Sequence, residues 1–202
     1  LKPKYFLLEN VKMKKEYEDV ITQYLGVKPI EINSALVSAQ NRKRLYWTNI
    51  PGVTQPEDKG IMLKDIVHEN VDFKTYLYSR KTGLGKEIDK STALCASDFR
   101  GLNRNQNQTS VVVEGYIRRL TPIECERLQT LPDNYTAIGV IDGKEVPISN
   151  TQRYKMLGNG WTVDVIAHIL SFIPETYLHT VVSLFDGISC GQVALERAGK
   201  VY

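Results

Sequence analysis

The segment with the most suggestive chemistry is residues 183–192, which read SLFDGISCGQ. Glycines and small polar residues there join an apolar stretch to a helical pattern, which predicts a strand, a tight turn and a helix from Gly191 to Ala198. Such turns at the carboxyl ends of strands in open α/β sheets let a ligand approach the backbone. The segment does not match G-x-G-x-x-G, so a plain tight turn remains the alternative interpretation.

A second group of polar side chains alternates along the chain. Gln40, Arg42 and Arg44 occupy every second position of the segment QNRKR. A strand places such residues on one face, because its side-chain period is two. Guanidinium groups suit oxygen-rich ligands, whereas a surface ion pair is the other interpretation of the two arginines.

These polar residues need elements to position them. The stretch YFLLENV, residues 5–11, predicts a buried strand, and residues 13–25 predict a helix that Gly26 ends. Residues 29–38 and 44–50 predict two strands of a hairpin. The pattern weakens over residues 52–116, where irregular β structure and loops are expected, with one strand near 110–113.

Periodicity returns in the last third of the chain. Thr121 followed by Pro122 and by Glu124 three residues on is typical of a capped helix start, here extending to about residue 130. Further helices are expected over residues 151–157 and 163–172, and residues 133–150 are expected to form a loop.

The middle region carries a local excess of positive charge, although the whole chain has a net charge of only +3. Between residues 74 and 104 the basic residues outnumber the acidic ones, Glu87, Asp89 and Asp98. A polar, basic segment suits contact with phosphate, and a solvated loop is the alternative. The basic residues are Lys74, Arg80, Lys81, Lys86, Lys90, Arg100 and Arg104.

Composition bounds the class of protein. The chain has 202 residues, of which 42% are apolar and 24% charged, as in ordinary globular proteins. Its three cysteines (Cys95, Cys125 and Cys190) form no disulfide framework and indicate a reducing, intracellular compartment. With three histidines and no C-x-x-C pair, no metal site is predicted, and no apolar run is long enough for a membrane span.

Five motifs together resemble the DNA cytosine-5 methyltransferase family. They are the SLFDGI strand and turn, E-N-V at residues 9–11, Q-x-R-x-R at 40–44, R-L-T-x-x-E-x-x-R-L-Q-x-x-P at 119–132, and G-N at 158–159. The unmatched residues, about 52–116, fall where the family keeps its variable target-recognition region. The resemblance is closest to the de novo class of these enzymes.

The resemblance implies a reaction and three catalytic residues, Glu9, Arg42 and Arg44. A methyl group would pass from S-adenosylmethionine to C5 of a cytosine flipped out of duplex DNA. Glu9 would handle a proton at N3 of the base, and the two arginines would hold the cytosine O2 and a nearby phosphate. The alternative for Glu9 is a strand-end carboxylate bonded to the Asn10–Val11 turn.

The resemblance also implies the binding residues. Phe185 would lie along the adenine of S-adenosylmethionine, and the following turn would surround its methionine part. A helix interruption packed on the core is the alternative for the G-N segment. The implied cofactor residues are Phe185, Asp186, Gly187, Ile188, Ser189, Gly191, Asn159, Gly160 and Trp161. The implied DNA contacts are Asn10, Gln40, Arg80, Lys81, Arg100, Asn103 and Arg104.

The chain departs from the family pattern in two ways. E-N-V comes first and the cofactor strand and turn last, an order that resembles circularly permuted, domain-rearranged members. No Pro-Cys occurs, although the family nucleophile is a cysteine after proline, and the three cysteines present are interpreted as packing residues. We therefore expect the nucleophile to come from a further segment of the same polypeptide or from a second subunit.

The expected architecture is α/β, with an incomplete Rossmann-like S-adenosylmethionine-dependent methyltransferase sheet and a small target-recognition lobe. Residues 1–50 and 151–202 are expected to form the catalytic part, and residues 51–150 the recognition region. A catalytically inactive DNA-binding subunit that stimulates a partner enzyme is the alternative function. The sequence leaves the target site and the biological role open, whether restriction-linked, phage-borne or epigenetic.

Overall fold

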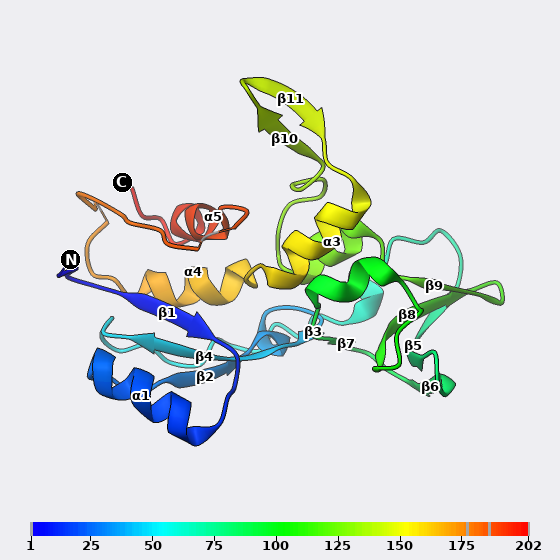
Figure 1. The fold of residues 1–202 in the computed structure, drawn as a ribbon, viewed down its shortest axis with the longest axis horizontal. Helices are drawn as coiled ribbons and strands as arrows, with labels where there is room; N and C mark the ends of the chain where they lie inside the picture. The colour runs from blue at the N-terminus through cyan, green and yellow to red at the C-terminus, as the bar shows by residue number, and fades with distance from the viewer. Residues whose placement is uncertain (1, 177, 186, 202) are drawn as a thin grey trace.

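The structure is a computed structural model that describes residues 2–176, 178–185 and 187–201. It is a mixed α/β fold with several separate sheets. A helix-flanked sheet carries the amino-terminal strands, and a second sheet lies at the opposite end of the molecule (Figure 1). No helix among the described residues is long and apolar enough to cross a membrane.

The first sheet has the order β1-β4-β2, built from Leu7–Asn10, Lys43–Thr48 and Ile30–Asn33. Both outer strands pair antiparallel with β4, so β1 and β2 run parallel to each other. The helix α1 (Lys15–Leu25) joins them and lies on one face of the sheet, while α4 (Val163–Ser171) lies on the other (Figure 1). The predicted strand, helix and hairpin are confirmed. The first strand was expected to be buried, but β1 is only half-buried, with Leu8 39% exposed.

Local chemistry explains where α1 and β2 end. Gly26 ends α1 in the left-handed conformation, with φ of 70°, and its N–H donates to the carbonyl of Thr22. The predicted strand over residues 29–38 is too long, since a short 3-10 helix, η1 (Ser34–Leu36), follows Asn33. The Asn33 side chain caps that turn by accepting from the N–H of Ala35.

The central insert forms a four-stranded antiparallel sheet of order β6-β5-β8-β9. These strands are Gly83–Glu87, Phe73–Ser79, Gln108–Val113 and Tyr116–Arg119. The region predicted as irregular β structure and loops thus contains a regular four-stranded sheet between its loops, and β8 confirms the strand expected near residues 110–113. A short 3-10 helix, η2 (Leu63–Asp65), precedes it.

Two short strands link the insert to the rest of the chain. β3 (Gln40–Asn41) pairs in parallel with β7 (Ser91–Thr92), which places the Q-x-R-x-R segment beside the insert. The 3-10 helix η3 (Ala96–Arg100) follows β7 and packs against α3 (Asn150–Asn159). The insert thus contacts both the segment that precedes β4 and the helix α3 that follows it in the sequence.

The helices of the last third surround the buried core. α2 (Pro122–Leu128) begins as predicted, because Thr121 accepts from the N–H of Glu124 and the Glu124 carboxylate accepts from the N–H of Thr121. α4 (Val163–Ser171) contributes five buried residues, and α5 (Cys190–Arg197) packs beside it. Both helices were predicted within a few residues of these bounds.

Two predictions of local structure are wrong. Residues 133–150 are not a loop: β10 (Ile138–Ile141) and β11 (Lys144–Pro147) form a hairpin that projects from the body of the molecule (Figure 1). Residues 180–185, predicted as a strand, are not in a strand. They pair with no other described strand, and an apolar run without a neighbour has no ladder to join.

Candidate active site

The structure brings Glu9 and Arg44 together. Glu9 lies on β1 and Arg44 on the adjacent β4, where Glu9 is opposite Tyr46 in the register. The Arg44 Nε and Glu9 Oε1 atoms are 3.0 Å apart, and each side chain retains 15% of its exposure. The pair is therefore largely sheltered from solvent but still accessible to a ligand.

The environment of Glu9 changes its acidity. Burial raises the pKa of the Glu9 carboxyl above its usual value. Arg44, Arg42 and a hydrogen bond from the side chain of Trp161 oppose this rise without cancelling it. Trp161 follows the G-N motif, so residues of the E-N-V and G-N segments meet at one carboxyl group.

Arg42 has a different environment from Arg44, although both belong to the Q-x-R-x-R segment. It is buried, with 4% exposure, and burial lowers the pKa of its guanidinium to about 10. Its Nη1 donates to the carbonyl of Leu94 at 2.9 Å, and its Nη2 donates to the carbonyl of Gly160 at 3.0 Å. These contacts direct its fork at main-chain oxygens of the protein.

The predicted alternation is present, although the segment is not one strand, since Arg42 lies between β3 and β4. Gln40 and Arg42 are buried, whereas Asn41 and Lys43 are exposed. Gln40 is fully buried, and its amide is bonded to Leu128, Gln129 and Leu94.

Gln40 in this geometry has no surface to offer to DNA, so the predicted DNA contact does not fit it. Asn10, the other DNA contact predicted near the catalytic strands, accepts a hydrogen bond on its side-chain oxygen from the N–H of Val11 at 2.8 Å. This bond closes the E-N-V turn locally through the Asn10 side-chain oxygen.

The predicted cofactor turn has unusual backbone angles. Phe185, Gly187 and Ser189 have φ of 60°, 64° and 58°, and a phenylalanine in the left-handed region is a conformational outlier. The Phe185 ring is entirely exposed. Asp186 lies outside the described residues. The segment that leads into α5 therefore presents a solvent-exposed aromatic ring.

The turn lies next to the G-N segment. A Cβ added to Gly160 would be 3.7 Å from the Cys190 Sγ, at the first residue of α5. The carbonyl of Ile188 accepts a hydrogen bond from the Tyr135 hydroxyl at 2.8 Å. Asn159 is exposed and Trp161 half-buried, while Gly191 lies in the first turn of α5. Tyr135 is a neighbour that sequence reasoning missed, since it belongs to no motif.

The predicted DNA-binding residues of the insert lie mainly on its surface. Arg80, Lys81, Arg100 and Asn103 are exposed. Arg104 is instead paired with Asp98, with 13% side-chain exposure, so it braces the insert. The N–H of Arg80 donates to the carbonyl of Arg104 at 2.7 Å, which brings the two loops together.

Substituting Arg80 and Arg100 with alanine is expected to weaken DNA binding and flatten its salt dependence. Each lost phosphate contact should reduce the slope of log affinity against log salt by about one. Titrations at several salt concentrations measure this slope, with the exposed Lys28, remote in sequence, replaced by alanine as a control. An unchanged slope in the Arg80 and Arg100 variants would exclude the insert surface as a phosphate contact.

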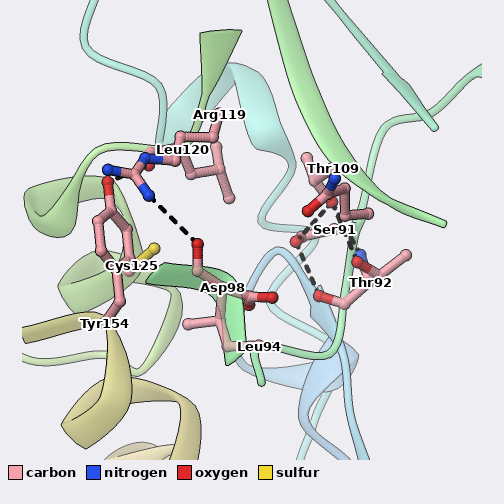
Figure 2. Close-up of a pocket in the computed structure, with 10 residues that line it drawn as sticks. Ser91, Thr92, Leu94, Asp98, Thr109, Arg119, Leu120, Cys125 and Tyr154 are labelled. Atoms are coloured by element: carbon pink, nitrogen blue, oxygen red, sulfur yellow. Dashed lines mark hydrogen bonds between the residues drawn. The ribbon is translucent and has the colours of Figure 1, made fainter. Parts of the chain in front are cut away.

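A separate pocket with both polar and apolar lining residues lies between the insert, α2 and α3 (Figure 2). The Arg119 guanidinium lies over the Tyr154 ring, 4.2 Å from its centroid, and donates to the carbonyls of Asp98 and Phe99. Ser91 and Thr109 share a hydrogen bond on the opposite side of the pocket. None of the predicted site residues lines this pocket.

The cysteines divide into two kinds. Cys125 and Cys190 are buried, as expected of packing residues, and burial raises the pKa of the Cys125 thiol well above its usual value. Cys95 is exposed, so its interpretation as a packing residue is wrong. Its Sγ contacts the carbonyl of Ala93 at 3.5 Å, beside the start of η3.

The family model for C-5 cytosine-specific DNA methylases matches residues 31–175 of this chain. The protein belongs to this family. The matched range includes the Q-x-R-x-R segment, the whole insert, α2 and the G-N segment, whereas β1 with the E-N-V motif and the turn before α5 lie outside it.

Several curated proteins are similar to the chain. The orphan methyltransferase M.SPRI of Bacillus phage SPR is 36% identical over 50% of this chain and 32% of its own length. The DNA (cytosine-5)-methyltransferase DRM1 of Arabidopsis thaliana is 27% identical over 96% of this chain and 34% of its own. The type II methyltransferase M.NlaX of Neisseria lactamica is 27% identical over 83% and 62%. The chain thus spans about a third of the first two relatives.

Proposed function

We propose that this chain is part of a DNA (cytosine-5)-methyltransferase that methylates C5 of a cytosine flipped out of duplex DNA. The observation that carries the proposal is the sheltered Glu9–Arg44 pair, with its raised carboxyl pKa. An accessory subunit that only holds DNA would have no use for such a group. Family membership and the names of the similar proteins support the same reaction.

The geometry suits the difficulty of this reaction. C5 of cytosine is a poor nucleophile until a thiolate adds at C6, and this addition develops negative charge at N3. A carboxyl group that keeps its proton to a higher pH can share that proton with N3, and this is the role we give to Glu9. Arg44 fits the cytosine O2, because its fork lies beside the same carboxyl group.

The residues of the chain also fit S-adenosylmethionine. Phe185 presents an exposed ring for an adenine, the left-handed turn after it exposes main-chain groups, and Gly160 keeps the facing side of the turn free of a side chain. When bound, S-adenosylmethionine supplies the methyl group that C5 receives. Trp161 would close the pocket from the side of Glu9.

We further propose that the β1-β4-β2 sheet belongs to a Rossmann-like methyltransferase layer and that the four-stranded insert is the target-recognition lobe. The helices on both faces of the first sheet and the exposed basic loops of the insert support this division. The order of motifs supports a circularly permuted arrangement. With no Pro-Cys in these residues, the nucleophile would come from another segment or a second subunit.

The substitution Phe185→Ala in the full-length protein is expected to weaken S-adenosylmethionine binding roughly 10- to 100-fold. This is the equivalent of losing the burial of one aromatic ring. Isothermal calorimetry measures the affinity. Tyr24→Ala is the matched control, since this tyrosine on α1 is also highly exposed. Equal affinities for the two variants would remove Phe185 from the pocket.

Duplex DNA that contains 5-fluorocytosine tests the whole proposal, because the enzyme stays covalently attached to this base after methyl transfer. The full-length protein with S-adenosylmethionine should give a denaturant-resistant adduct on a cysteine outside residues 1–202. Residues 1–202 alone should give none. An adduct mapped to Cys95, Cys125 or Cys190 would contradict the assignment of the nucleophile, and no adduct with the full-length protein would favour the accessory role.

A further inference from the structure

Three segments far apart in the sequence meet around a small set of buried main-chain groups. The first is the Gln40–Arg44 segment, the second is Leu94–Ala96 of the insert, and the third is the end of α3 at residues 158–160. A Cβ added to Gly158 would lie 2.1 Å from the carbonyl carbon of Cys95. The insert backbone therefore rests directly on the segment that leads into the predicted cofactor residues.

One guanidinium group bridges these segments. Arg42 donates through Nη1 to the carbonyl of Leu94 at 2.9 Å, and through Nη2 to the carbonyl of Gly160 at 3.0 Å. Its Nη2 also lies 3.4 Å from the carbonyl of Gly158. Since these acceptors are main-chain oxygens, the position of the fork sets the positions of both backbones.

Two buried glutamines complete the arrangement. Gln129 donates to the carbonyls of Leu157, at 2.6 Å, and Gly160, at 3.2 Å, and its oxygen accepts from the Thr162 hydroxyl. Gln40 accepts from the N–H of Leu94 at 2.8 Å. Both glutamines are fully buried. The carbonyl of Gly160 thus receives hydrogen bonds from two buried side chains.

The segment held in this way carries the predicted cofactor residues. Gly160 lies beside Cys190 at the start of α5, and Trp161 bonds to Glu9. A shift of the Gly160 carbonyl would therefore move both the contact of Gly160 with α5 and the side chain of Trp161. Arg42 is only 4% exposed and both of its terminal nitrogens donate to main-chain carbonyls, so little of its guanidinium is open to a ligand.

We infer that Arg42 is a positioning residue of the S-adenosylmethionine pocket, which fixes Gly160 and Trp161 from the insert side, and not a ligand of cytosine or phosphate. The inference rests on the proposed function. It gives the two arginines of the Q-x-R-x-R segment separate tasks: Arg44 acts on the base, and Arg42 shapes the cofactor pocket.

The test compares Arg42→Lys with Arg44→Lys in the full-length protein. Lysine keeps the charge but cannot hold two carbonyls with one planar fork. Arg42→Lys is expected to weaken S-adenosylmethionine binding about tenfold in calorimetry, the equivalent of one charged hydrogen bond. Its DNA affinity should stay within about twofold of that of the unsubstituted protein, and its loss of activity should be smaller at saturating S-adenosylmethionine than below saturation. Arg44→Lys should leave the affinity unchanged and lower kcat.

A second variant protects the test against misfolding. Gln129→Met has a similar shape, removes the other hydrogen bond to Gly160 and leaves Arg42 intact, so it should weaken S-adenosylmethionine binding in the same direction. Arg118→Lys is the matched control, because Arg118 pairs with Glu69 of the insert and Glu124 of α2 and has no hydrogen bond to Gly160. Thermal unfolding confirms that each variant is folded.

The outcomes separate the inference from the function on which it rests. An Arg42→Lys protein with unchanged S-adenosylmethionine affinity but weaker DNA binding or lower kcat would overturn the positioning role and restore a role on the base. If the unsubstituted protein itself bound no S-adenosylmethionine, the proposed function would fail, and the positioning role with it.

Discussion

Glu9→Gln is expected to lower the methylation rate of the full-length protein about 10²- to 10⁴-fold, the usual contribution of a general acid or base. An amide has the shape of the carboxyl group and can donate a hydrogen bond, but it cannot transfer a proton to N3. Single-turnover kinetics measures the rate. Glu31→Gln is the control, since Glu31 is a carboxylate at the surface of β2, paired with Lys12.

The raised pKa of Glu9 predicts how the methylation rate of the unsubstituted protein depends on pH. The proton on Glu9 is retained above the usual carboxyl range and is lost as pH rises through the folded-state pKa, so a rate that needs this proton should fall over that window. Glu9→Gln should lack that fall.

Stability has the same sign, because a raised folded-state pKa makes the contribution of Glu9 complete at low pH and lost as pH rises. The amide variant should therefore lose little stability at neutral pH. If Glu9→Gln lost its activity because the protein was largely unfolded at neutral pH, Glu9 would be a structural residue.

Gly158→Ala is expected to destabilise the protein by about 3 kcal/mol, at the upper end of overpacking costs. The new Cβ would lie 2.1 Å from the Cys95 carbonyl carbon and 2.2 Å from the Ala96 nitrogen. These are backbone atoms, so η3 must move away from α3 as a unit. The gain in helix propensity from alanine, about 1 kcal/mol, is too small to offset this.

Gly139→Ala is the matched comparison, since its new Cβ would also meet an atom too closely, the Ile148 Cδ1 at 2.8 Å. That atom is the end of a flexible side chain on the hairpin, and it can rotate away. Urea unfolding should show a change of less than about 1 kcal/mol for this variant. Equal losses for the two glycines would mean that the contact between η3 and α3 is not as close as described.

The sequence predicted best where the signal is local. The start of α2 depends on Thr121 and Glu124, three residues apart, and the αL end of α1 depends on Gly26 alone. The β10–β11 hairpin was missed, although Asp142-Gly143 is a turn signal, because both strands are largely exposed and show no clear alternation. Residues 180–185 have strand propensity, but pairing is a tertiary property.

The candidate site divides in the same way. Alternation correctly placed Gln40 and Arg42 on one face, since period two needs no knowledge of the rest of the chain, but it did not tell that this face is buried. Where their hydrogen bonds end depends on Leu94, Gln129 and Gly160, which lie between 50 and 120 residues away. No spacing rule predicts such contacts, so a buried glutamine was expected at the DNA surface.

The buried Glu126 anchors the residues just before the β10–β11 hairpin, so we expect the backbone hydrogen bonds at its base and at its tip to open at very different rates. Its carboxylate accepts from the N–H groups of Asn134 and Thr136 and pairs with Arg153 at 2.8 Å, so these amides open only when a buried ion pair is exposed. A few residues on, the hairpin has only two strands, and Val140 and Ile141 are exposed. Its tip can fray and re-form many times while its base stays closed, so that amide exchange along one short segment runs from among the fastest in the protein to among the slowest.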